Sequence, residues 1–120
     1  GKNALDANTT ASNNTAVGTS ALKANTTGTQ NTALGALAGD AVTTGTENLA
    51  VGYLSLSAST TGSGNVAVGK SALSSDTQGS SSTAVGQLAL SSQNLTSATE
   101  AQNTAVGTSP LAFKTSFWGV

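Results

Sequence analysis

The chain has 120 residues and a formal net charge of −1, and only 8% of its residues are charged and 3% aromatic. Cysteine and histidine are absent, which excludes disulfides and the zinc sites that Cys or His would build. The four basic residues form no basic patch of the kind that binds nucleic acid, and no apolar run is long enough to cross a membrane.

So few large side chains leave two structural interpretations. One is a disordered chain, and the other is a narrow repeat fold in which small side chains fill a thin core. Disordered chains are commonly rich in proline and net charge, whereas this chain has one proline and almost no net charge. The composition therefore favours the repeat fold, and the length allows one domain.

A seventeen-residue repeat runs along the chain, as the constant step from Gly18 to Gly35 and onward shows. Each unit starts with Asn or Ser, continues with Thr, Leu or Val, then with Ala and Val or Leu, and reaches a glycine. An Ala-Leu pair and a Thr-Thr-Gly turn follow. Units begin near Asn14, Asn31, Asn48, Asn65, Ser82 and Asn103. Their turn glycines are Gly18, Gly35, Gly52, Gly69, Gly86 and Gly107.

This period predicts one turn of a parallel β-solenoid, because a unit of this length is too short for a helix pair, which needs about 34 residues. We expect two short strands per coil, one in the N-T-A-V-G run and one in the Ala-Leu run, with glycines at the corners. The chain is thus predicted to be all-β, with the repeat domain over residues 1–111 and a C-terminal cap or junction over 112–120. The stacked asparagines are predicted to form an amide ladder.

Neighbouring residues of a strand point to opposite faces, so the Ala and the Val or Leu of each unit cannot both lie inside the coil. One column should fill the interior, and the other, also apolar, needs cover from elsewhere. We expect chains to associate along it as a parallel homotrimer, with a wider monomeric coil as the alternative. The predicted spine is Ala16, Val17, Ala33, Leu34, Ala50, Val51, Ala67, Val68, Ala84, Val85, Ala105 and Val106.

The N-T-A-[VL]-G-x-x-A-L units with T-T-G turns resemble the head repeats of trimeric autotransporter adhesins (the YadA-like head), and still more the repeats of bacteriophage tail fibres. The resemblance covers the chain from Gly1 to about Leu111. It implies a left-handed, trimeric β-roll outside the cell, on a virion tail fibre or a bacterial surface, that serves attachment. Adhesin repeats are commonly shorter than the unit of this chain, which favours the phage fibre. The resemblance assigns no function to any single residue.

The sequence offers few residues that could catalyse a reaction or bind a metal. The chain has five acidic residues in all. Asp6 and Asp40 share one column, but Lys23 lies between them, which predicts a solvated charge ladder rather than an acid–base pair. We therefore expect no enzyme, no metal and no cofactor.

An ice-binding β-solenoid is the alternative function, because paired threonines in register suit a flat ice-binding face. The pairs are Thr27/Thr29, Thr44/Thr46 and Thr61/Ser63. The glycine within each pair argues instead for a corner.

Two segments depart from the repeat and are the candidates for binding a cell-surface glycan or protein receptor. Four extra residues fall between Ser91 and Gln102, where a bulge is favoured over a binding loop. Large aromatic residues appear only after the repeats, where a cap is favoured over a sugar-stacking patch. The candidate binding residues are Asn94, Thr96, Thr99, Phe117 and Trp118.

Overall fold

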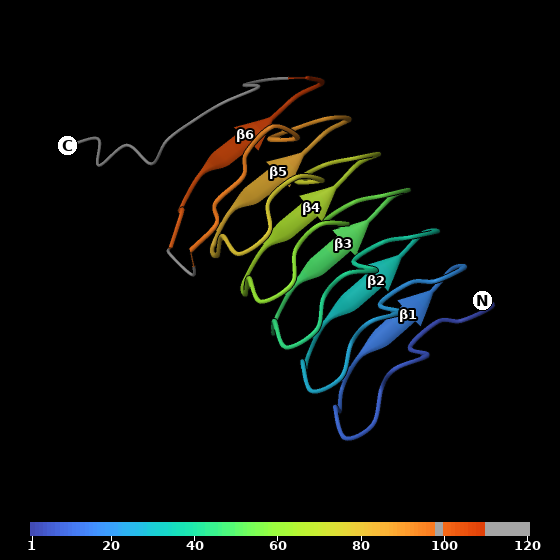
Figure 1. Ribbon diagram of the computed structural model, residues 1–120. Coiled ribbons are helices and arrows are strands. Elements are labelled where there is room, and N and C mark those ends of the chain that lie inside the picture. Colours follow the sequence, from blue (N-terminus) through green and yellow to red (C-terminus); the bar gives the residue numbers. More distant parts are fainter. Residues whose placement is uncertain (98–99, 110–120) are drawn as a thin grey trace.

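The computed structural model describes residues 1–97 and 100–109, which wind into stacked coils with one short strand each (Figure 1). All six strands pair in parallel and in chain order, and the described residues contain no helix. The predicted all-β parallel solenoid is therefore confirmed. The strands are β1 (Thr15–Val17), β2 (Thr32–Leu34), β3 (Leu49–Val51), β4 (Val66–Val68), β5 (Thr83–Val85) and β6 (Thr104–Val106).

The strand register follows the sequence repeat without a slip. Ala16 lies opposite Ala33 and so on upward, one repeat unit at a time, until Ala84 lies opposite Ala105 across the longer last unit. The extra residues of that unit are accommodated outside the sheet. The insertion therefore changes the outline of one coil and leaves the pairing of β5 with β6 intact.

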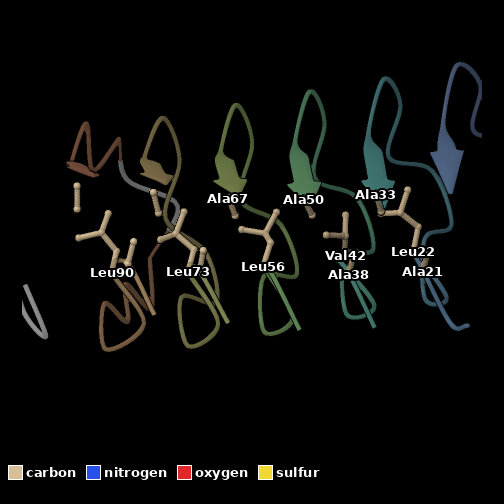
Figure 2. Close-up of a cluster of buried hydrophobic side chains, with 14 residues drawn as sticks. Ala21, Leu22, Ala33, Ala38, Val42, Ala50, Leu56, Ala67, Leu73 and Leu90 are labelled. Carbon is tan, nitrogen blue, oxygen red and sulfur yellow. The ribbon is translucent and has the colours of Figure 1, made fainter. Parts of the chain in front are cut away.

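The core is a thin layer of side chains inside the coils. The strand alanines point inward, and those of β2 to β6 are at most 4% exposed. Figure 2 shows them facing a second row that comes from the opposite side of each coil. The largest side chains of that row are leucines that are at most 1% exposed, namely Leu22, Leu56, Leu73 and Leu90. A coil this narrow has room for one large side chain, which explains the small residues elsewhere in the unit.

The second strand expected in each coil does not form. The Ala-Leu run lies in a turn, and its leucine has a positive φ, for example 49° at Leu22 and 52° at Leu56. A left-handed residue costs about 1 kcal/mol, and full burial of a leucine contributes about 2 kcal/mol in return. The turn still bonds to the next coil, since the Leu22 N–H donates to the Ala38 carbonyl at 3.0 Å. The Ala-Leu signal thus marked a core position correctly and its backbone conformation wrongly.

The third coil fills its interior in a different way. Gly39 stands where other coils carry leucine, and the buried Val42 side chain enters the space (Figure 2). A Cβ on Gly39 would lie 3.1 Å from Leu22 Cδ2 and 3.6 Å from Val42 Cγ2. Val42 also interrupts a polar column, and the buried Asn25 Oδ1 and Ser59 Oγ on either side of it have no hydrogen-bond partner. Packing is preserved there at the expense of two polar groups.

The turn glycines form one straight file along the rod. Gly18, Gly35 and Gly69 have φ angles of 136°, 137° and 129°, which side chains rarely adopt. A Cβ on Gly18 would overlap the Gly35 carbonyl oxygen, and one on Gly69 would lie 2.5 Å from that of Gly86. Both the backbone angle and the contact between coils therefore require glycine.

Candidate functional site: the outer face of the sheet

The outward-pointing side chains of the six strands form one continuous face, called here the outer face. Its first column contains the residues that open the strands: Thr15, Thr32, Leu49, Val66, Thr83 and Thr104. Its second column contains the residues that close them: Val17, Leu34, Val51, Val68, Val85 and Val106. The alternation of the strand thus places the predicted alanine half of the spine inside the coil and the Val/Leu half outside.

The outer face is uncharged and in contact with solvent, and its second column is apolar throughout. Val17 is 54% exposed, Leu34 49% and Val106 71%, while the closing valines of β3 to β5 are half-buried. Leucine and valine replace threonine in the first column at β3 and β4, so the middle of the face is wholly apolar. A continuous apolar surface of this kind on a soluble protein is typical of an interaction site.

Buried asparagines make the support of this face rigid. The Oδ1 atoms of Asn31 and Asn48 each accept a hydrogen bond at 3.0 Å from the backbone N–H of the asparagine one coil further on. Their Nδ2 groups donate to the carbonyls of Gly45 and Gly62 at 2.8 and 2.9 Å. The expected ladder is present, and it joins side chain to backbone more than amide to amide. Each asparagine thereby ties a strand to the turn of the next coil.

The threonine-rich turns bond mainly within the stack. The Oγ1 of Thr43 donates to the Thr60 carbonyl at 3.0 Å, and the Oγ of Ser63 accepts the Thr46 N–H at 3.0 Å. In the pairs considered for ice binding, Thr27, Thr44 and Thr61 are exposed, whereas their partners Thr29, Thr46 and Ser63 are half-buried. The pairs lie at a corner outside the strands, so this geometry does not favour the ice-binding alternative.

A buried polar network that the sequence did not reveal anchors the insertion. Asp76 is 2% exposed, and its Oδ1 accepts the N–H groups of Gly79 and Leu95, each at 3.0 Å. Its Oδ2 accepts a hydrogen bond from Gln93 Nε2, and Gln93 Oε1 accepts one from Asn103 Nδ2 at 2.7 Å. The one available signal was a carboxylate in a column that holds Asn8 and Asn25 in earlier coils.

The candidate binding residues are only partly placed by the structure. Asn94 and Thr96 are exposed on the insertion, and Asn94 Oδ1 accepts a hydrogen bond from Thr77 Oγ1 at 3.3 Å. Thr99, Phe117 and Trp118 lie outside the described residues, as does the whole predicted cap at 112–120. Of the candidate binding residues, the structure thus describes Asn94 and Thr96, which both lie on the insertion.

The charged column behaves differently from the expected solvated ladder at one position. Asp40 is half-buried, and this burial raises the pKa of its carboxyl group, although the backbone and Lys23 act in the opposite direction. Its Oδ1 atom is buried without a hydrogen-bond partner. Partial burial therefore outweighs the neighbouring ammonium group.

Residues 1–97 and 100–109 contain neither a ligand pocket nor a recognisable metal site or membrane-spanning helix. That part of the chain encloses no pocket and holds no cluster of three or more His, Cys, Asp or Glu side chains that could bind a metal. It also contains no helix that could cross a membrane. No family model matches the chain, and no match is found among curated proteins or solved structures.

Proposed function

We propose that this chain is a structural and adhesive segment of a trimeric fibre that works outside the cell, in a phage tail fibre or a bacterial surface adhesin, and serves attachment to a cell surface. The observation that carries the proposal is the outer face. It is uncharged, it carries an at least partly exposed valine or leucine on every strand from β1 to β6, and its centre at β3 and β4 is wholly apolar. Exposed apolar side chains are unfavourable on a single rod in water, whereas association of several rods would bury them.

Parallel association follows from the repeat itself. Every coil closes its strand with an outward valine or leucine, so two copies pointing the same way bring apolar residues together at every level. The face is three residues wide, or roughly 10 Å, and three such narrow faces around a common axis can exclude water from one another. The resemblance of the repeat unit to trimeric fibre proteins agrees with three copies.

The mechanism of such a segment is mechanical. Backbone and asparagine hydrogen bonds along the rod resist bending, and three copies present the same polar surface to a receptor at once. Weak individual contacts to a glycan or a protein receptor then add up through avidity. This role requires neither a cofactor nor a catalytic step.

The solution mass of the purified chain tests the assembly. Light scattering should give three times the chain mass of 11.5 kDa at micromolar concentration. Val51→Lys places a charge at the centre of the outer face and should yield monomers that keep the β circular dichroism signal. Thr61→Lys, at an exposed corner, is the matched control and should remain trimeric. A monomeric unmodified chain would contradict the proposal.

Binding to cells tests the adhesive part. A fluorescent form of the chain should bind intact cells or a glycan array, and Val51→Lys should weaken this binding about 100-fold because it removes avidity. If trimers bind no surface, the adhesive half of the proposal is wrong and the shaft role alone stands.

A further inference from the structure

Two largely exposed columns border the outer face, one on each side. The entry flank precedes the strands and contains Asn13, Gln30, Glu47, Gly64, Ser81 and Gln102. The exit flank follows the turn glycines and contains Lys2, Thr19, Ala36, Tyr53, Lys70 and Gln87. If copies of the chain cover the outer face, these flanks are the next surfaces to meet.

Tyr53 is conspicuously large for the exit flank. Its neighbours one coil away are Ala36 and Lys70, and its own side chain is 48% exposed. Single exposed aromatic residues are common, but this one borders the wholly apolar centre of the outer face at β3 and β4. Its ring therefore extends the apolar surface around the corner of the coil.

Gly64 is conspicuously small for the entry flank, and nothing within one chain requires a glycine there. Its φ of 67° is close to the 60° at which Glu47 and Ser81 carry side chains in the same column. A Cβ on Gly64 would lie 3.8 Å from Ser81 Oγ, which is ordinary contact. By contrast, a Cβ on Gly62 would overlap the Gly79 carbonyl oxygen. Gly62 is needed by the stack, and Gly64 is not.

Symmetry brings the two flanks together. In a parallel assembly around an axis along the rod, the copies lie side by side and are related by rotation. The entry flank of one copy therefore faces the exit flank of the next. The chain climbs one level per repeat unit, and along the sequence Tyr53 falls between Glu47 and Gly64, which are one unit apart. Tyr53 of one copy therefore lies between the levels of Glu47 and Gly64 of its neighbour.

We infer that Tyr53 of each copy packs against the neighbouring copy between Glu47 and Gly64, with its ring in the space that Gly64 leaves open, and that this contact fixes the register of the assembly. The missing side chain at position 64 makes room for the ring. This inference rests on the proposed association through the outer face, and it adds the residues that align one copy against the next.

Engineered cysteines test the contact directly, because the chain has none of its own. In one chain the two flanks are separated by a strand, roughly 13 Å or more, whereas a disulfide needs Cα atoms within about 7 Å. A disulfide in Tyr53→Cys/Gly64→Cys can therefore form only between copies. Mild oxidation should convert this variant into covalently joined oligomers under denaturing electrophoresis. The matched control, Tyr53→Cys/Asn13→Cys, places the second cysteine in the same flank but 40 residues before position 53, more than two coils away or about 11 Å along the rod. This control should cross-link at least about tenfold more slowly.

Single substitutions give an independent readout. Tyr53→Thr and Gly64→Ser copy residues from the same columns, so each should leave the β circular dichroism signal unchanged and weaken association at least about tenfold. Trimers that form with unchanged affinity, or that cross-link equally in both cysteine pairs, would overturn the inference and leave the proposed function standing. A monomeric unmodified chain would overturn both.

Discussion

The regular coils and the coil that holds the insertion reach the same register by different means. In the regular coils, asparagines such as Asn48 tie each level to the next. In the insertion, the buried network of Asp76, Gln93 and Asn103 takes over part of this role. The pairing of Ala84 with Ala105 is nevertheless the same as in every other step. The strand side of the coil is therefore invariant, whereas the turn side varies from coil to coil.

The largest effect should come from the glycine file that the regular coils share. Gly69→Ala forces a side chain onto a φ of 129° and within 2.5 Å of the Gly86 carbonyl oxygen. We expect a loss of at least about 3 kcal/mol in the free energy of unfolding, measured by urea denaturation. Thr61→Ala, at an exposed corner away from the outer face, should change it by less than about 1 kcal/mol. A loss at Gly69→Ala as small as the loss at Thr61→Ala would mean that the stack tolerates side chains along the file.

The buried carboxylate of the insertion should come next. Asp76→Ala leaves the N–H groups of Gly79 and Leu95 without their acceptor, which should cost about 2–3 kcal/mol. Hydrogen exchange should accelerate most at Leu95 and little at the amides of β1 to β3. Asn48→Ala is the comparison in a regular coil and should loosen the coils on both sides of it. If Asp76→Ala loosened β1 to β3 equally, the insertion would not be a separate unit.

The irregular third coil offers a repair experiment. Gly39→Leu alone should crowd Val42 and Leu22, and Val42→Asn alone should leave a void beside Gly39. Together they restore the pattern of the neighbouring coils, with an amide at position 42 that can reach the unpaired Asn25 Oδ1. We expect each single variant to be destabilised and the pair to couple favourably by at least about 1 kcal/mol in a double-mutant cycle of urea denaturation. Additive effects would show that the two positions do not share one space.

The smallest effect should concern the partly buried carboxyl of Asp40. Burial raises its pKa above the ordinary value of 3.8 in the folded state, so the folded protein holds the proton more tightly than the unfolded chain does. Asp40 should therefore lower the stability of the fold as pH rises above 3.8, up to its folded pKa. Asp40→Ser, the residue found at 57 and 74, should raise Tm slightly at neutral pH and flatten its dependence on pH in calorimetry. A fall in Tm at neutral pH would contradict this assignment.

The solenoid could be predicted from the sequence because one repeat unit forms one coil. The column of turn glycines could be predicted as well, because it follows from the constant spacing and not from side-chain packing. The sequence did not predict that the Ala-Leu run forms a turn, because leucine rarely adopts a positive φ and only burial explains it at Leu22. The exchange between Gly39 and Val42, and the network around Asp76, depend on contacts that no spacing reveals. The outer face was foreseen as a surface in need of cover, and the trimer that would cover it stays a prediction.

The constant register between coils also bears on how the molecule can change in size. The hydrogen bonds that the Asn48 side chain makes to Asn31 and Gly62 reach only adjacent coils. Removing or duplicating one whole unit would therefore join surfaces that already fit, and would shorten or lengthen the rod by about 4.8 Å. The length of the rod can therefore change in equal steps when whole repeat units are gained or lost in the gene.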